Sequence, residues 1–599
     1  MQNLKRSYLF FLVPLGYSLF FWVDFLADVL GRYPVLDARE NLFWVQRFQG
    51  EGLPEEPFYR ALLYPWLLSF LPGLPVGALV FGLVVHLVNA WLVAGLAEYL
   101  WKSRNAARVG GVLYVMNPVS LFFAVQVLDI TLGISFFLGA VISLFRIGRG
   151  VDAWGSAVSC GLLIGLATLT RPSFLLVGIA LCFLPLVLPF LQKDSKWPLV
   201  ARSAFIISIS FGSLLMTQGV LNQSISGEFR VLPWQGAYNL YAANKTGANG
   251  KYFAQAVSFE SLPPGVNPTR MESEVLYKQT HPDVETLDIA SMSSYWRGRL
   301  IEDVTGDPLR WLGLMGRKLV YLFNDWEQYN NLSYAYQKGR FPVLSVNPLG
   351  WGVVLLLAFT AVFGAWAKMN KEAFLAILVV ASAYAGGVLL FYVSARFRLP
   401  LAPLLSVLAS GLACLSKDSF RGGSKMVLYI GCVVGLAIFT FGNWANARDE
   451  STFIQDKTLL AISANALGED ELALKYSGAV LGEQPARQDM LRIRVTSLFN
   501  LWLVEVDEAA RAEYWATLGD ALEILKSLDA STGFIRGVYA WNVGEREMAR
   551  RQWAETADRF KDAAIGSKIA LSVVTGGAAA HYPSEMVRQI RELLSVPEP

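Results

Sequence analysis

Eleven apolar runs occupy most of the first 444 residues of this 599-residue chain. A membrane-spanning helix needs about 20 largely apolar residues, and most of the runs approach that length. Only 17% of the residues are charged, compared with about 25% in soluble proteins, and the mean hydropathy is +0.40. We therefore expect an all-α polytopic membrane protein. The expected spans centre on residues 7–27, 76–100, 109–125, 130–146, 156–170, 173–191, 199–221, 348–366, 373–391, 400–416 and 426–444.

Lys and Arg are concentrated in every second connection between these runs. Because cytoplasmic loops of membrane proteins are enriched in these residues, the pattern predicts a cytoplasmic-membrane protein with its N-terminus inside and its C-terminal segment outside. The cations concerned are Lys5 and Arg6; Lys102, Arg104 and Arg108; Arg146 and Arg149; Lys193, Lys196 and Arg202; Lys368 and Lys371; and Lys417, Arg421 and Lys425.

Three longer segments then lie on the outer face. Residues 28–75 contain two stretches, 40–49 and 61–71, with the pattern of amphipathic helices that lie along a membrane interface. Residues 222–347 are rich in Gly, Pro, Asn and Tyr, which predicts long ordered loops. We therefore expect a membrane domain at 1–444 and a separate outer domain at 445–599.

The outer domain contains a self-similar pair of segments, residues 463–480 and 539–556. A small residue, a glycine, an acid and an alanine recur at matching positions, and this pattern is similar to a tetratricopeptide repeat, in which paired helices pack closely. A helical bundle without repeats is the alternative, and both are packing modules. The matched pairs are Ala464 with Ala540, Gly468 with Gly544, Glu469 with Glu545, and Ala473 with Ala549.

Composition argues against several kinds of site. With 51 basic and 48 acidic residues, the chain has no basic excess of the kind that attracts nucleic acid. Its four cysteines lie inside apolar runs and its three histidines are far apart, so no metal site is expected. Neither a dinucleotide-binding nor a Walker motif is present, so no cofactor is expected.

Charged residues at the outer ends of the spans do not follow the topology rule. Placing a charge in a membrane costs at least a few kcal/mol, so such residues are candidates for function. Arginine suits a phosphate because its planar fork donates two parallel hydrogen bonds. A lipid-linked phosphate at the outer leaflet is therefore the expected ligand of Arg60, Arg171, Arg396 and Arg398.

Simpler interpretations of the same residues remain. Arginines at span ends also reach for lipid headgroups, and Asp37 could be a helix cap. Around the expected phosphate, a donor or acceptor pocket is predicted from polar residues in the same outer segments, although packing or turn formation would also explain several of them. These residues are Glu40, Tyr59, Tyr64, Asp129, Asn244 and Lys245.

The first outer segment, "LDARENLFWVQRFQGEGLPEEPFYRALLYPWLLSF", resembles the first outer loop of bacterial family 39 glycosyltransferases. These are membrane enzymes of the GT-C superfamily, related to protein O-mannosyltransferases and to the lipid A aminoarabinose transferase. The resemblance extends over residues 1–445, and some members similarly end in tetratricopeptide-like helices. Weaker matches are "LYVMNPVSLFFAVQVLDITL", "TRPSFLL", "GAYNLYAANKTGANGKY" and "ARFRLPLAP".

The resemblance implies an enzyme that transfers a sugar from a polyprenyl phosphate carrier to a hydroxyl group outside the cytoplasmic membrane. The family's first-loop acid acts as general base, a role that falls on Asp37. The related O-mannosyltransferases have an Asp-Glu pair where this chain has Asp37-Ala38, with Glu40 further on. The acceptor would be a glycolipid, a polysaccharide or a protein, and the C-terminal repeats would offer a surface to a protein partner.

Elementary chemistry leads to the same roles. A hydroxyl is a poor nucleophile, so a carboxylate must accept its proton, and guanidinium groups would stabilise the charge on the departing phosphate. Direct displacement would invert the anomeric carbon. Two other functions stay open: a transporter or flippase, for which charges deep within the spans would be typical, and a membrane-anchored repeat scaffold.

Overall fold

The computed structural model describes residues 2–596 without 51, 54–55, 149–151, 188–196, 253–256, 258–265, 452, 577–578 and 580, and gives side chains from residue 12 onward apart from 187 and 197–200. The predicted cytoplasmic cations Arg149, Lys193 and Lys196, and the side chains of Lys5 and Arg6, lie outside the described residues. The chain forms two compact units, Met1–Thr452 and Phe453–Pro599, so the division falls eight residues after the expected one. Within the described residues, helices are the only regular secondary structure, which confirms the all-α prediction.

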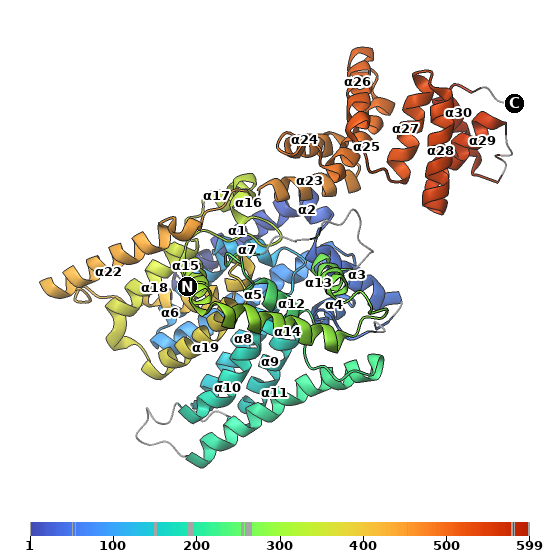
Figure 1. The fold of residues 1–599 in the computed structure, drawn as a ribbon. Coiled ribbons are helices and arrows are strands. Elements are labelled where there is room, and N and C mark those ends of the chain that lie inside the picture. The colour runs from blue at the N-terminus through green and yellow to red at the C-terminus, as the bar shows by residue number, and fades with distance from the viewer. Residues whose placement is uncertain are drawn as a thin grey trace. The chain divides into compact units, whose positions relative to one another are not determined.

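Seven helices of the first unit are long and apolar enough to cross a bilayer, counting only the described residues. Helices α8, α9 and α11 pack side by side in this unit (Figure 1). These seven helices are α5 (Val76–Trp101), α8 (Ile130–Gly148), α9 (Ala153–Thr170), α11 (Trp197–Ser226), α18 (Trp351–Ala365, extended by η3, Trp366–Lys368), α19 (Lys371–Leu390) and α22 (Gly423–Phe441).

The other four predicted spans are also helical, but they are bent or short. Two pass the same test only when both helices at a bend are counted, which gives up to nine spans. Two more are shorter than a full span within the described residues, where each of the eleven apolar runs is mostly helical. The bent pairs are α1 (Gln2–Ala27) with α2 (Val29–Arg32) and α3 (Asp37–Gly50), and α6 (Arg104–Val115) with α7 (Pro118–Ala124); the short helices are η1 (Pro172–Phe174) with α10 (Leu175–Val187), and α21 (Leu401–Ala409) with η4 (Ser410–Cys414).

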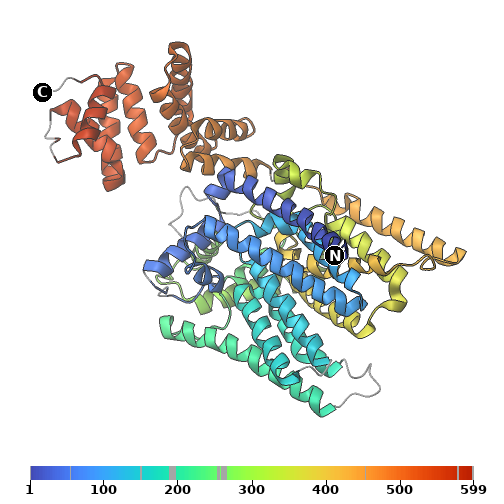
Figure 2. The same ribbon diagram turned by 180° about the vertical axis from the view of Figure 1, so that it is seen from behind.

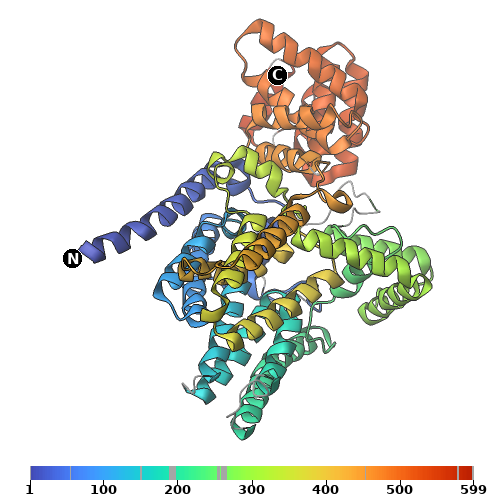
Figure 3. The same ribbon diagram turned by 90° about the vertical axis from the view of Figure 1, so that its left-hand side faces the viewer.

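Each bend has a local cause. The second, of 59°, falls at Pro118, which has no N–H with which to continue α6, while the Asn117 side chain caps α7 by accepting a hydrogen bond from the Ser120 N–H. The first bend, of 80°, follows Ala27, where Asp28 caps α2. The chain therefore changes direction after α1 (Figure 3), and Asp37, at the start of α3, does not continue the axis of α1.

The second outer segment is more helical than its composition predicted. Two long helices, α14 and α15, cover residues 289–323, a stretch without the Gly, Pro and Asn clusters that mark the loops before it. With α3, α4, α12 and α13, α14 lies near one end of α8 and α9 (Figure 1). The remaining helices of the unit are α4 (Leu63–Leu68), α12 (Gly236–Ala242), α13 (Pro268–Thr280), α14 (Ile289–Gly306), α15 (Pro308–Phe323), α16 (Tyr334–Arg340), α17 (Pro342–Ser345), α20 (Ala395–Arg398) and η5 (Trp444–Asn446).

Helix α22 shows that the unit is built for a lipid environment. Five large aliphatic side chains on it are exposed, and soluble proteins rarely expose an apolar patch of this kind. A bilayer is the solvent in which such a face is stable, so the first unit is a polytopic membrane domain. The exposed side chains are Val427, Leu428, Ile430, Val434 and Ile438.

The second unit consists of paired antiparallel helices (Figure 2). Its two self-similar segments adopt the same turn: Gly468 and Gly544 have positive φ, and the next residue donates its N–H to the carbonyl of Ala464 or Ala540. The likeness to tetratricopeptide repeats stays a prediction. The helices are α23 (Phe453–Ala466), α24 (Asp470–Leu481), α25 (Gln488–Val504), α26 (Glu508–Ile524), α27 (Ala530–Asn542), α28 (Arg546–Phe560), η6 (Lys561–Ala564), α29 (Ile565–Thr575) and α30 (Ser584–Leu593).

Close packing of α27 on α28 gives a test of this unit. The indole of Trp553 is fully buried and lies where a Cβ on Gly537 would collide with it. We expect Gly537→Ala to destabilise the second unit by about 1–3 kcal/mol, as overpacking does in well-packed cores. Chemical unfolding of the whole chain, followed by fluorescence, measures this. Gly482→Ala, where a Cβ meets only ordinary contacts, is the control, and equal effects would contradict the packing.

Candidate active site

The first turn of α3 carries two acidic residues, Asp37 and Glu40. Residues three apart on a helix share a face, and acids are favourable at a helix N-terminus. The helix begins directly after Leu36, whose φ of 52° is in the left-handed region. Leucine has no side chain that favours this conformation, which costs roughly 1–2 kcal/mol. Backbone strain of this kind is a feature of many active sites, and here it directly precedes Asp37.

Asp37 lies between two arginines. Its Oδ1 is 3.2 Å from Arg60 Nη1, and its Oδ2 is 2.6 Å from Arg396 Nη1. The same Arg60 nitrogen is 2.6 Å from Glu40 Oε2. The side chains of these four residues are only 6–15% exposed. The side chain of Asn331 adds a hydrogen bond to Asp37.

Burial and charge act in opposite ways on the two acids. Burial alone would raise the pKa of Asp37, but Arg60 and Arg396 outweigh it and hold the pKa well below its usual range. Burial raises the pKa of Glu40, and the single contact with Arg60 does not offset burial and the nearby Asp37 charge. Burial alone would lower the pKa of Arg60, but the charges of the two carboxylates outweigh burial and raise this pKa above its usual value. Asp37 is therefore the firmly ionised member of the pair.

A second ion pair lies beside the first. Arg171 Nη1 is 3.0 Å from Asp129 Oδ1, and the Arg171 guanidinium lies 4.2 Å from the centre of the Phe397 ring. The guanidinium of Arg396 approaches the same ring at 5.8 Å. The charge of Asp129 acts on Arg60 and Arg396. Three acids and three arginines from distant parts of the sequence thus form one charge-balanced group, which we call the charged cluster: Asp37, Glu40, Arg60, Asp129, Arg171 and Arg396.

The charged cluster has hydrogen-bond donors to spare. Within the described residues, the buried Nε groups of Arg171 and Arg396 have no hydrogen-bond partner, and neither does the buried hydroxyl of Tyr64. The negative charge of Asp129 acts on this hydroxyl. Buried polar groups are usually hydrogen-bonded, so these three groups leave donors available to a ligand. Their donors suit an anion.

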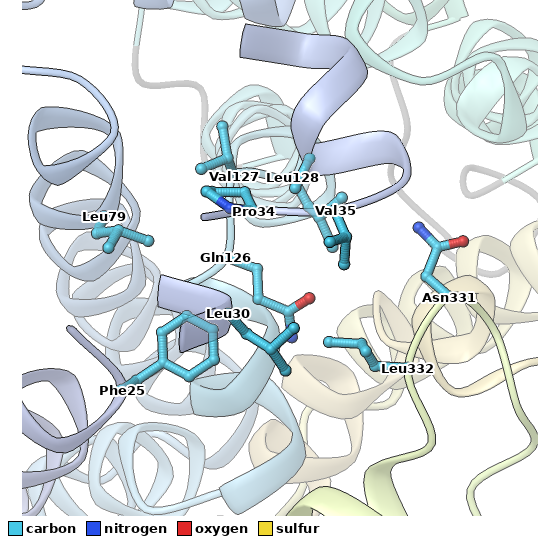
Figure 4. Close-up of a pocket in the computed structure, with 11 residues that line it drawn as sticks. Phe25, Leu30, Pro34, Val35, Leu79, Gln126, Val127, Leu128, Asn331 and Leu332 are labelled. Atoms are coloured by element: carbon cyan, nitrogen blue, oxygen red, sulfur yellow. The ribbon is translucent and has the colours of Figure 1, made fainter. Parts of the chain in front are cut away.

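Two pockets adjoin the charged cluster, and they differ in chemistry. The first is mostly aliphatic (Figure 4). It includes Phe25 from the end of α1, Leu79 from the start of α5, and Asn331, the hydrogen-bond partner of Asp37. We call it the apolar pocket. Its lining residues are Phe25, Leu30, Pro34, Val35, Ala38, Leu79, Gln126, Val127, Leu128, Asn331 and Leu332.

The second pocket combines charged and aromatic side chains. Arg60 and Glu40 belong to both this pocket and the charged cluster. Asp37 therefore contacts a residue of each pocket: Arg60 of this one and Asn331 of the apolar pocket. We call this one the polar pocket. Its lining residues are Glu40, Trp44, Glu56, Pro57, Phe58, Tyr59, Arg60, Leu62, Asn267 and Arg270.

Three predicted site residues do not join this group. Asn244 donates to the carbonyls of Leu240 and Leu390 and accepts from Trp311 and Lys318, so its hydrogen-bonding capacity is used in packing. Among the described residues, Lys245 makes no contact with the charged cluster. Arg398 is 1% exposed and pairs with Glu327 at 2.8 Å; it also donates to backbone carbonyls of residues 321–326.

Sequence reasoning missed Asn267, Arg270 and Asn331. Asn267 and Arg270 lie at the start of α13 and contact Glu40 and Glu56, more than 200 residues earlier in the chain. The only local signal was the pair of asparagines at 330–331, because asparagine tolerates the positive φ of 64° that Asn331 adopts. Among the described residues, no three His, Cys, Asp or Glu side chains are grouped to hold a metal ion.

The chain is similar to two solved oligosaccharyltransferases from Archaeoglobus fulgidus. The first, archaeal AglB in complex with an inhibitory peptide and a dolichol-phosphate, is 10% identical with a TM-score of 0.38, over 76% of this chain and 58% of that one. The second, in complex with Zn and sulfate, is 13% identical with a TM-score of 0.35, over 75% and 55%. This chain thus matches little more than half the length of either protein.

No protein-family model matches the chain, and no curated protein matches it. Because the TM-scores are low, the site is interpreted from its own residues. The resemblance to family 39 glycosyltransferases stays a prediction from the sequence.

The different surroundings of Arg398 lead to a prediction. Removing one partner of a buried ion pair typically costs about 3–5 kcal/mol, so we expect Arg398→Met to destabilise the membrane unit strongly, with partial recovery in the Arg398→Met/Glu327→Gln double variant. Thermal unfolding in detergent measures both. A stable Arg398→Met protein that had lost only ligand binding would contradict this role and restore the phosphate-binding expectation.

Proposed function

We propose that this protein transfers a glycosyl group from a polyprenyl-phosphate-linked sugar to a hydroxyl acceptor. One observation carries the proposal: Asp37 is held between Arg60 and Arg396 and interacts with one residue of each pocket, Asn331 of the apolar pocket and Arg60 of the polar pocket. A lipid-linked sugar phosphate has the same three parts in the same order, an apolar tail, an anion and a polar ring.

The arginines of the charged cluster are the proposed binding site for the phosphate of the donor. Fixed guanidinium groups in a buried site stabilise charge that develops on a leaving phosphate without having to reorganise. Arg60 and Arg396 both reach one point beside Asp37, and Arg396 has a buried Nε without a partner in the described part of the chain. Arg171 lies 4.2 Å from the centre of the Phe397 ring and supplies a third positive charge.

The apolar pocket is the proposed binding site for the first part of the lipid tail. Phe25 and Leu79 line it from the ends of two membrane helices, so an isoprenoid chain in the bilayer could extend its first units into the pocket without crossing a polar layer. Burying each CH2 group is worth about 0.8 kcal/mol, which favours a long lipid over a soluble sugar phosphate.

Asp37 is the proposed general base. A phosphate that binds Arg60 and Arg396 competes with Asp37 for their positive charge, so its binding raises the pKa of Asp37 towards its ordinary value and makes the carboxylate a better proton acceptor. The acceptor oxygen then bonds to the anomeric carbon as the bond from that carbon to the phosphate oxygen breaks. The hydroxyl proton goes to Asp37, and polyprenyl phosphate leaves with the bonding electrons, which inverts the anomeric carbon.

The distribution of Lys and Arg supports a location at the outer face of the cytoplasmic membrane, with the C-terminal unit outside. The acceptor is a glycolipid, a polysaccharide or a protein, and the paired helices of residues 453–599 would contribute to its selection. Apart from the lipid-linked donor, no cofactor is part of the proposal.

The experiment is donor turnover by the purified full-length protein. A panel of radiolabelled polyprenyl phosphate sugars is incubated with the protein and envelope fractions as acceptors, and free polyprenyl phosphate is quantified. We expect one sugar of the panel to be transferred. Movement of intact donor across proteoliposomes without cleavage would indicate a flippase instead, and a folded protein that neither binds nor cleaves any donor would indicate a scaffold.

A further inference from the structure

We infer that the polar pocket is the sugar subsite of the proposed transferase, and that Glu40 and Asn267 recognise hydroxyl groups of a neutral sugar there. This inference rests on the proposed function and goes further by naming residues and a substrate class. It draws on contacts of α3 and α13 that the sequence did not predict.

The first support is the position of the pocket relative to Asp37. One nitrogen, Arg60 Nη1, contacts both Asp37 and Glu40. A phosphate bound to Arg60 therefore has Asp37 on one side and the polar pocket on the other. The sugar attached to that phosphate has to lie within one bond of it, and the polar pocket is the adjoining space with polar walls.

The second support is the rigid pair formed by Asn267 and Glu40. Asn267 Nδ2 donates to Glu40 Oε2 at 3.0 Å, while Asn267 Oδ1 accepts from the Thr269 N–H and caps α13. The amide is thus oriented from both ends. A carboxylate and an amide side by side offer acceptors and a donor to neighbouring hydroxyls, which is the arrangement that discriminates between sugars, since an unmatched buried polar group is costly.

The walls of the pocket are also fixed. Arg270 makes a two-point ion pair with Glu56 and a further one with Glu274 at 2.8 Å. Its guanidinium lies 5.9 Å from the Tyr59 ring and 5.2 Å from the Trp234 ring. A prearranged site of this kind loses little entropy when it binds a ligand.

The charge and the aromatic walls of the pocket define the ligand. Two carboxylates, Glu40 and Glu56, are balanced by two guanidiniums, Arg60 and Arg270, so the pocket does not favour a sugar with a net charge. Its aromatic members provide flat faces for the C–H face of a sugar ring.

The test separates the sugar from its carrier. In Asn267→Ser, serine keeps the helix cap but removes the amide donor. We expect the affinity of the full-length protein for the sugar-bearing donor to fall on the order of tenfold, as for loss of a hydrogen bond to a charged or rigid partner, with binding of sugar-free polyprenyl phosphate unchanged. Asn370→Ser, which alters an asparagine cap of α19 outside the pocket, is the control and should change neither.

Deoxygenated donors locate the hydroxyl concerned. The donor that lacks the recognised hydroxyl should bind the unaltered protein more weakly, and Asn267→Ser should weaken it no further, because the interaction is already missing. Equal weakening of sugar-bearing and sugar-free carriers by Asn267→Ser, or no effect on either, would overturn the subsite while leaving the proposed function intact. If the unaltered protein bound no polyprenyl phosphate at all, the proposed function would fail and this inference with it.

Discussion

Asp37→Asn is expected to lower the rate of sugar transfer by roughly 10²–10⁴-fold, the usual contribution of a general base, while leaving donor binding intact. Asparagine has the shape of aspartate but does not accept a proton at neutral pH. It also removes the negative charge that competes with phosphate for Arg60 and Arg396, so the affinity for polyprenyl phosphate should be retained or increased. Initial rates at saturating donor, together with equilibrium binding of sugar-free polyprenyl phosphate, measure both effects.

The matched control is Asp28→Asn. Asp28 lies on the same segment and is also paired with an arginine, Arg340, but it is not part of the charged cluster, and asparagine preserves its cap on α2. Its variant should transfer sugar at close to the original rate. Transfer by Asp37→Asn at the rate of this control would rule out Asp37 as the base, and loss of donor binding together with activity would mean that Asp37 is needed for structure.

Arg396→Ala should weaken binding of polyprenyl phosphate by roughly 30-fold or more, because truncating a buried, hydrogen-bonded charge typically costs about 2–5 kcal/mol. Arg60→Ala should behave similarly, since both guanidiniums contact Asp37 from different sides. Arg340→Ala, which breaks the pair with Asp28, serves as the control. If neither Arg396→Ala nor Arg60→Ala weakened the binding of polyprenyl phosphate, the proposal that its phosphate binds at this site would be contradicted.

The same residues give a test of coupling. Either single change leaves an uncompensated charge in a buried site, so Asp37→Asn/Arg396→Ala should destabilise the protein by less than the sum of the two single effects. The double variant should still be inactive, because it has neither the base nor the full phosphate site. Additive losses of stability would show that the two side chains do not interact.

Much of the fold follows from hydropathy. Within the described residues, each of the eleven apolar runs is mostly helical, and the acids of α3 lie on one face because they are three residues apart. Hydropathy does not determine where the backbone hydrogen bonds stop, so the run at 400–416 forms α21 and η4, which together are shorter than a span. For the same reason, the helices within residues 222–347 were not predicted.

The site was less accessible from the sequence. Arg396 and Arg398 both belong to the four-residue helix α20, and residues two apart on a helix face different ways. Arg396 turns to Asp37 and Arg398 to Glu327, a choice that depends on tertiary contacts and not on either residue's neighbours in the chain. The pairing of Arg171 with Asp129 and the approach of Asn267 to Glu40 are likewise products of the folded chain.

The most direct measurement is an experimental map of the full-length protein with polyprenyl phosphate bound. We predict phosphate oxygens at hydrogen-bond distance, about 3 Å, from the guanidiniums of Arg60 and Arg396, and the first isoprene units beside Phe25 and Leu79. Asp37 should then have lost at least one of its two arginine contacts. A lipid phosphate bound elsewhere, with both ion pairs of Asp37 unchanged, would contradict the proposed site.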